Sequence, residues 1–179
     1  MREIELKFKV ENVNNIISFL EKNNCEISSA NIQKDTIYVR DLQNVESTEG
    51  SIWLRVRKTN EKVELNYKKQ SSKKMESEEI EFEVSSYELA NKFLAALGFK
   101  EWVQVNKKRT YTKYQKYNIC IDEVERLGTF IEIELLIPEK NDIDYEKELL
   151  EVAKEIGIDI TTRINSHYDT MISELISKE

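Results

Sequence analysis

Two pairs of glutamates occur at a spacing of two residues, in stretches that alternate between charged and apolar side chains. Glu3 and Glu5 lie near the start of the chain, and Glu132 and Glu134 lie in its last alternating stretch. On a β-strand such residues point the same way and lie about 6.7 Å apart, so two carboxylates can converge on one cation. Mg²⁺ and Mn²⁺ favour oxygen ligands, and Mg²⁺ often combines carboxylates with substrate phosphates. The spacing therefore predicts a site for a hard divalent cation.

Basic side chains share the charged faces of such stretches, and they suit a phosphate-rich ligand. Carboxylates alone would repel that ligand, whereas each close opposite charge contributes roughly 4 kcal/mol at about 4 Å and an effective dielectric near 20. Arginine offers a planar fork for phosphate oxygens, and lysine offers a point charge. A lining of both signs is what a metal–triphosphate complex requires. The bases are Lys7, Arg55, Arg57, Lys68, Lys107 and Arg109.

This chemistry needs no serine, cysteine or histidine nucleophile, because phosphoryl and nucleotidyl transfer depend on positioning and charge neutralisation. The single histidine, His167, lies beside the apolar stripe of the last expected helix, and we interpret it as a surface or capping residue. The sequence has no Walker-type glycine loop, so side chains would have to hold the phosphates. A purely structural network of ion pairs is the alternative, since mutual pairing would satisfy many of these charges.

Eight expected strands must position these residues, each with one apolar and one charged face. Alternation with a period of two predicts the strands, and clusters of polar turn residues separate them. The polar stretches 41–51 and 69–77 are expected to be flexible loops. The expected strands are 3–10, 33–40, 52–58, 63–68, 79–84, 103–114, 117–124 and 129–136.

Four amphipathic helices are expected from apolar residues spaced by three and four positions. In the second helix, Ser85 and Glu88 are spaced as a capping box, and the apolar stripe is Leu89, Ala90, Phe93, Leu94 and Leu97. The succession of strand, helix and three strands occurs twice, which indicates an internal duplication. The other three stripes are Val13, Ile16, Ile17 and Leu20; Tyr145, Leu149, Val152, Ala153 and Ile156; and Tyr168, Met171, Ile172, Leu175 and Ile176.

Strands with one charged face cannot form a sandwich, because the inner faces of a sandwich are apolar. We therefore predict an α+β fold: a closed eight-stranded antiparallel β-barrel, or tunnel, with a charged interior and helices packed on the outside. The inverse arrangement, a carrier with an apolar interior, would leave the four helix stripes without a partner. We expect a single domain over 1–179, with two halves at 1–69 and 76–137 and C-terminal helices at 143–178.

Length and composition limit the classes of function. The chain has 179 residues and a net charge of −7, which fits one domain and excludes nucleic-acid binding through bulk attraction. Cys25 and Cys120 lie far apart, with no C-x-x-C motif. The start does not resemble a signal peptide, and no window approaches the roughly eighteen apolar residues of a membrane span. We expect a cytoplasmic protein with two free thiols and no membrane role.

A set of motifs appears in a defined order along nearly the whole chain. E-x-E-x-K at 3–7 is followed by L-R-x-R at 54–57, by Lys68 and by K-x-R at 107–109; then come Asp122 and L-G-x-F-x-E-I-E at 127–134. This set resembles the CYTH family, also called the triphosphate tunnel metalloenzymes. The resemblance implies an eight-stranded tunnel that binds a triphosphate through its bases and Mg²⁺ or Mn²⁺ through its acids.

The resemblance also implies a role for each matching residue. The metal-binding residues would be Glu3, Glu5, Asp122, Glu132 and Glu134. The phosphate-binding residues would be Lys7, Arg55, Arg57, Lys68, Lys107 and Arg109, and the catalytic ones Lys7, Arg57 and Glu5. The stretch 163–168, RINSHY, is similar to the family's C-terminal R-x-S-Y region. Ser77 stands where relatives often place an arginine, so that phosphate contact stays unassigned.

Length and the region 105–134 look most like the class IV adenylate cyclase branch of the family. This likeness implies conversion of ATP to cyclic AMP and pyrophosphate, a phosphorus–oxygen lyase reaction. Other branches are hydrolases, and the shared motifs bind the triphosphate rather than its appendage. The alternative is therefore hydrolysis of tripolyphosphate, thiamine triphosphate or a nucleoside triphosphate. A third hypothesis is a non-catalytic polyphosphate or nucleotide sensor. The resemblance also implies a homodimer.

Overall fold

The computed structural model describes residues 2–43, 45, 50–70, 77–137 and 145–179. Its helices are α1 (Asn14–Lys22), α2 (Tyr87–Ala96), α3 (Tyr145–Ile156) and α4 (Tyr168–Ile176), with a short 3-10 helix η1 (Ile160–Thr162). Its strands are β1 (Arg2–Val10), β2 (Asn31–Val39), β3 (Ile52–Lys58), β4 (Val63–Gln70), β5 (Ser77–Val84), β6 (Lys100–Tyr114), β7 (Tyr117–Val124), β8 (Gly128–Ile137) and β9 (Arg163–Ile164).

The described strands form one sheet in the order β5-β4-β3-β2-β6-β7-β8-β1-β9. The pairs β1–β8, β1–β9, β2–β3, β3–β4, β4–β5 and β7–β8 are antiparallel. The fold is therefore α+β, with an antiparallel sheet of nine strands and four α-helices in the described residues.

The prediction of eight strands needs a correction. Arg163 and Ile164 form a ninth strand, β9, opposite Phe8 and Lys7 of β1. Two residues are too few to produce a readable alternation, so the sequence pattern could not reveal this strand. No pairing among the described residues joins β5 to the other end of the strand order, so closure of the sheet into a barrel stays a prediction.

The chain divides into two compact units. Unit 1 consists of Met1–Asn31 and Lys108–Asn165, and unit 2 consists of Ile32–Lys107 and Ser166–Glu179. Each unit has its own cluster of buried apolar side chains. The predicted single domain spans both units and stays a prediction. The predicted loops 41–51 and 69–77 and the start of the C-terminal segment lie partly outside the described residues.

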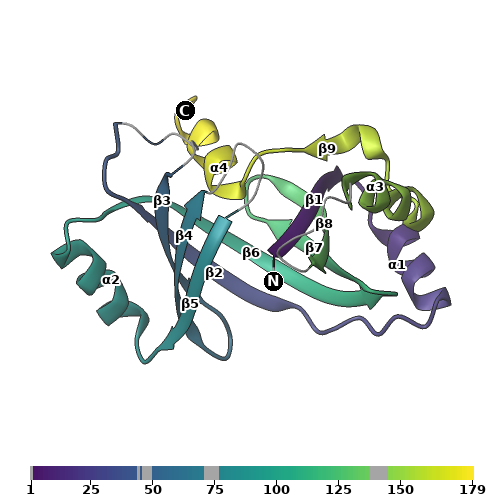
Figure 1. The fold of residues 1–179 in the computed structure, drawn as a ribbon, viewed down its shortest axis with the longest axis horizontal. Helices are drawn as coiled ribbons and strands as arrows, with labels where there is room; N and C mark the ends of the chain where they lie inside the picture. Colours follow the sequence, from purple (N-terminus) through teal and green to yellow (C-terminus); the bar gives the residue numbers. More distant parts are fainter. Residues whose placement is uncertain (1, 44, 46–49, 71–76, 138–144) are drawn as a thin grey trace. The chain divides into compact units, whose positions relative to one another are not determined.

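In unit 1, the apolar face of β1, β7 and β8 is covered by helices. Leu6 lies opposite Ile133, which in turn lies opposite Ile119, so one face of three strands is apolar. Leu20 of α1 and Leu149 of α3 are fully buried in the same cluster. The two helices lie side by side in Figure 1. Burial of each large apolar side chain contributes about 1.5–3 kcal/mol, so this face anchors the unit and leaves the charged face for other work.

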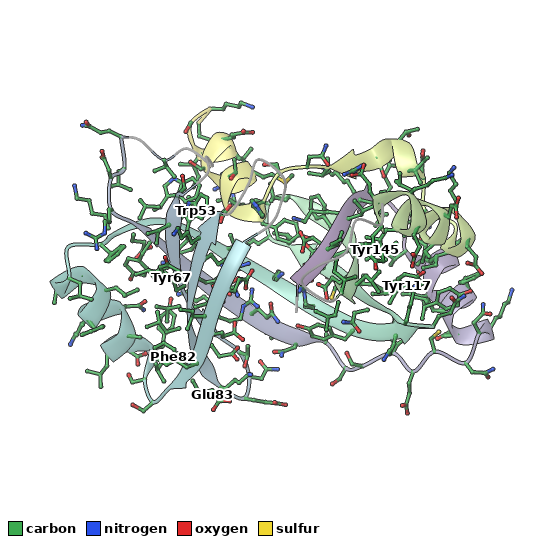
Figure 2. The ribbon with its side chains drawn as sticks, in the orientation of Figure 1. Trp53, Tyr67, Phe82, Glu83, Tyr117 and Tyr145 are labelled. Carbon is green, nitrogen blue, oxygen red and sulfur yellow. The ribbon has the colours of Figure 1, made fainter. Side chains whose placement is uncertain are left out.

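Two tyrosines fasten α3 to the strands of unit 1. The Tyr117 hydroxyl donates to Glu148 at 2.6 Å, and the Tyr114 hydroxyl donates to Glu155 at 2.6 Å. Tyr117 is labelled in Figure 2. Tyr114 ends β6 and Tyr117 begins β7, so these bonds add orientation to the apolar packing of α3.

In unit 2, α2 packs on the apolar face of β2, β3 and β4. Ala90 and Leu94 are buried against Val56 and Tyr38. Figure 2 places Tyr67 of β4 on the side of the strands that faces α2. The stripes of α1, α2 and α3 therefore have apolar partners, whereas the inverse arrangement would have left them without any.

The predicted apolar stripe of α2 is only half buried. Leu89, Phe93 and Leu97 are more than half exposed, at 63%, 58% and 55%. Periodicity places them near the buried side, but it cannot say how much of an apolar arc a sheet will cover. The N-cap is also one residue later than predicted: the Ser86 hydroxyl accepts a hydrogen bond from the Leu89 amide at 3.2 Å.

The predicted free thiols are confirmed, since neither Cys25 nor Cys120 forms a disulfide. Cys120 is buried and Cys25 is partly exposed. Among the helices of the described chain, none combines the length and the apolar character that crossing a membrane requires.

Candidate functional site

Three carboxylates lie together on the charged face of unit 1, and we call Glu5, Glu132 and Glu134 the acidic triad. Each offers one carboxylate oxygen, and these oxygens lie within 4.8 Å of one another. The antiparallel ladder brings them together, because Glu5 of β1 lies opposite Glu134 of β8 and Glu132 is two residues away on the same face. Three oxygen donors held on paired strands are a donor set that hard divalent cations accept. The residues therefore fit the predicted metal.

Lys7 lies next to the acidic triad and partly compensates its charge. Its Nζ is 3.3 Å from Glu132 Oε1 and 3.8 Å from Glu5 Oε1. The ammonium group is almost fully buried, and Lys7 lies opposite Glu132 in the β1–β8 ladder. One lysine beside three acids leaves negative charge for further cations to balance.

Arg109 of β6 is the second cation of this cluster. Its Nε donates to Asp122 Oδ1 at 2.6 Å and its Nη2 to Asp122 Oδ2 at 2.5 Å, which makes a two-bond fork. Nη2 also donates to Glu132, and Nη1 lies 3.8 Å from Glu134. Burial alone would lower the pKa of Arg109, but the bond to Asp122 and the charge of Glu132 raise it well above its usual value. Arg109 is thus a permanent cation that ties Asp122 to the triad.

The five predicted metal-binding residues therefore take different positions. Glu5, Glu132 and Glu134 form the triad, whereas both Asp122 oxygens accept bonds from Arg109. Glu3 lies on β1 opposite Leu136, and its side chain lies outside the part that the structure describes.

Cys120 belongs to none of the sequence motifs, yet it lies beside the triad. Its Sγ is 3.3 Å from Glu134 Oε1 and is fully buried, opposite Glu132 in the β7–β8 ladder. Burial raises the pKa of this thiol, and the neighbouring carboxylates act in the same direction, so the thiol stays protonated and can donate to Glu134. The alternation of β7 offered the signal, because Cys120 shares the face of Asp122.

Arg55 and Arg57 of β3 form the centre of a separate basic cluster in unit 2. Arg57 donates from Nε to Asp35 Oδ1 and from Nη2 to Asp35 Oδ2, both at 2.7 Å. Arg55 Nη1 lies 3.9 Å from Asp35 Oδ2, and Arg55 Nη2 lies 3.5 Å from Glu81. Burial acts to raise the pKa of Asp35, but Arg57 and Arg55 together hold that pKa below its usual range. Asp35, which belongs to none of the sequence motifs, therefore carries a negative charge among the bases.

Arg55 is only partly satisfied by the described residues. Its Nε is buried and has no hydrogen-bond partner among them. Burial lowers the pKa of Arg55, and the positive charge of Arg57 lowers it further. A buried cationic donor beside a like charge is costly, and an anion placed there would relieve both the missing bond and the repulsion.

The remaining predicted phosphate-binding residues of unit 2 have partners of their own. Lys68 Nζ is 2.7 Å from Glu79 Oε1, and the Lys107 ammonium lies 5.0 Å from the centre of the Tyr168 ring. His167 takes the N-cap position of α4, although its side chain makes no capping hydrogen bond. It is half-buried, and its backbone carbonyl accepts a bond from the Met171 amide at 3.1 Å.

Comparisons with known proteins identify a family and several similar chains. A family model described as the CYTH domain matches residues 1–168. A Methanocaldococcus jannaschii protein named "Putative adenylate cyclase" is 28% identical over 171 residues, which is 94% of this chain and 97% of that protein. The solved structure of a Pyrococcus horikoshii protein is 29% identical, with a TM-score of 0.79 over 94% of this chain and 98% of that one.

A more distant solved structure shares the fold. It is a Hippeastrum protein described as a "putative adenylyl cyclase" with a dominant triphosphatase activity. It is 17% identical, with a TM-score of 0.61 over 98% of this chain and 96% of that one.

Proposed function

Because this chain belongs to the CYTH domain family, we propose that it is a divalent-metal-dependent enzyme that acts on a triphosphate. The leading reaction is that of a class IV adenylate cyclase, which converts ATP to cyclic AMP and pyrophosphate. The single observation that carries the proposal is the acidic triad, whose oxygens lie within 4.8 Å of one another. Lys7 and Arg109 offset only part of the charge of the triad and Asp122, and a divalent cation would offset the rest.

The metal of this proposal is Mg²⁺ or Mn²⁺. Glu5, Glu132 and Glu134 would hold it, and the proposal keeps Glu3 and Asp122 as further metal-side residues. When bound, the ion would withdraw electron density from phosphate oxygens and neutralise part of their charge.

The bases would bind and orient the phosphates. The buried Nε of Arg55 has no hydrogen-bond partner among the described residues, and Arg57 lies beside it. This arrangement favours binding of an anion in unit 2. In unit 1, Lys7 and Arg109 are buried cations beside the triad. Lys68 and Lys107 complete the proposed set, in which Glu5, Lys7 and Arg57 are the catalytic residues. Orientation and charge neutralisation by such groups are the main protein contributions to this class of reaction.

The proposal includes the closed eight-stranded tunnel as the arrangement that would enclose the triphosphate. The strand order and the charged strand faces are compatible with it. A cytoplasmic location and a homodimer complete the proposal: the first is inferred from the two free thiols, and the second from the family resemblance. Size-exclusion chromatography with light scattering would test the homodimer, and a monomeric mass would remove it.

A triphosphatase is the second candidate function. The description of the Hippeastrum relative favours it, because that relative is an adenylyl cyclase by name with a dominant triphosphatase activity. Cyclisation requires attack by the ribose 3′-oxygen on the α-phosphorus, whereas hydrolysis requires water at the γ-phosphorus. Both reactions would use the same bases and acids, so only identification of the products distinguishes a cyclase from a triphosphatase.

The test is incubation with ATP, thiamine triphosphate and tripolyphosphate under Mg²⁺ or Mn²⁺, followed by product identification. Cyclic AMP with pyrophosphate supports the cyclase, orthophosphate release supports the triphosphatase, and tight binding without turnover supports a sensor. Glu5→Gln and Arg57→Ala should each abolish most of the turnover. Glu123→Gln is the matched control, because Glu123 is an exposed acid of β7 in unit 1. Full turnover in both Glu5→Gln and Arg57→Ala would refute the proposed site.

A further inference from the structure

We propose that Asp35 is a positioning residue, which holds Arg57 and Arg55 in the orientation that binds phosphate. The inference rests on the proposed function, since it assumes that the two arginines meet a triphosphate. Neither the sequence motifs nor the comparisons assign a role to Asp35.

The geometry around Asp35 is that of a clamp on one guanidinium. Asp35 of β2 lies opposite Arg57 of β3 in the antiparallel ladder, and only 4% of its surface is exposed. Two parallel hydrogen bonds of 2.7 Å fix the plane of the Arg57 guanidinium as well as its position. The same carboxylate lies 3.9 Å from Arg55 Nη1, so one acid reaches both arginines.

Positioning and simple charge compensation predict opposite effects on anion binding. A carboxylate among bases repels a phosphate, so its neutralisation would strengthen binding if charge were its only contribution. If the carboxylate instead holds the guanidinium plane, its loss frees a long side chain that must be ordered again when the ligand binds. The sign of the change in affinity therefore separates the two roles.

Glu64 provides a matched control on the other side of the same arginine. It lies opposite Arg57 in the β3–β4 ladder and is almost as buried as Asp35, at 7% exposed. Among the described residues, its carboxylate pairs with Lys62 and not with an arginine. Asp35→Asn and Glu64→Gln thus remove the same charge from the two strands that flank β3, but only the first removes a clamp.

The experiment is calorimetric titration of tripolyphosphate into the wild-type protein and both variants, without added metal and at fixed salt. Asp35→Asn should weaken binding about tenfold, because pre-organisation of the binding group is lost. Glu64→Gln should change the affinity less than about twofold. With substrate and metal, Asp35→Asn should raise KM more than it lowers kcat.

The outcomes separate the inference from the function on which it rests. Unchanged or tighter binding of tripolyphosphate by Asp35→Asn would overturn the positioning role and leave the proposed function intact. A folded wild-type protein that binds no tripolyphosphate either without metal or with added Mg²⁺ or Mn²⁺ would overturn both. If circular dichroism shows that Asp35→Asn does not fold, Arg57→Lys serves instead, because it keeps the charge and loses the fork. Arg57→Lys should also bind about tenfold more weakly, and wild-type affinity in that variant would overturn the inference.

Discussion

Loss of one partner of the buried ion pair between Arg109 and Asp122 should destabilise unit 1, and Asp122→Asn tests this. Asp122 is fully buried and Arg109 is 8% exposed, so neither charge is screened by water. The substitution keeps the shape of the side chain but removes its charge, and its amide nitrogen cannot accept a hydrogen bond from the guanidinium. Arg109 would then remain buried with only part of the negative charge that balances its guanidinium.

The expected loss of stability in Asp122→Asn follows from the burial of the pair and from the partner that Arg109 keeps. Removal of one member of a buried ion pair costs about 3–5 kcal/mol. Arg109 keeps its bond to Glu132, so we expect the lower end, about 3 kcal/mol. For a chain of this size, 1 kcal/mol lowers Tm by about 2–4 °C, which gives a decrease of about 6–12 °C.

Urea denaturation and thermal melting, both followed by circular dichroism, measure the effect. Glu123→Gln is the control, since Glu123 is the next residue of β7 and pairs with Lys108 at 3.8 Å on the exposed side. Exposed pairs contribute about 0–1 kcal/mol, so this variant should melt close to the wild type. Equal Tm values for Asp122→Asn and the wild type would show that Arg109 tolerates the loss of its buried partner, and the reasoning would fail.

Two further predictions concern unit 2. Burial raises the pKa of Asp35, but the arginines outweigh this effect and hold it below its usual range. The contribution of Asp35 to the free energy of unfolding is therefore fully present above about pH 4, and it is lost as the pH falls toward the lowered pKa. Urea denaturation at about pH 5 and about pH 3 should show a larger loss for the wild type than for Asp35→Asn, and parallel losses would contradict this. On α2, Leu94→Ala should cost about 3 kcal/mol, because Leu94 is 2% exposed. Phe93→Ala, at a 58% exposed position, should cost far less in the same assay, and equal costs would show that the helix face is wrongly assigned.

The sequence alone determined which face each strand presents. Alternation places Glu5 and Lys7 on one face of β1 and Leu6 on the other, because successive side chains of a strand point to opposite sides. The same rule separated Glu132 and Glu134 from Ile133. The α+β class and the helices on the apolar faces followed from this division, since each apolar face needs a partner.

The sequence could not determine how much of the apolar face of α2 the sheet covers, and it could not reveal the two-residue strand β9. The pattern of α2 shows an apolar arc, but only tertiary packing decided that Leu94 is buried and that Phe93 is not. Similarly, β9 exists because Arg163 and Ile164 meet β1, and two residues carry no period.

Only the tertiary structure decided which charges meet. A shift of two residues between β1 and β8 would keep every side chain on its own face, yet it would separate Glu5 from Glu134. Register therefore built the acidic triad, and it also placed Asp35 against Arg57 and Cys120 beside Glu134. The physical reason is that the face on which a side chain lies depends on one strand alone, so the local sequence encodes it. An ion pair across a sheet depends on two strands, and therefore on how distant parts of the chain pack.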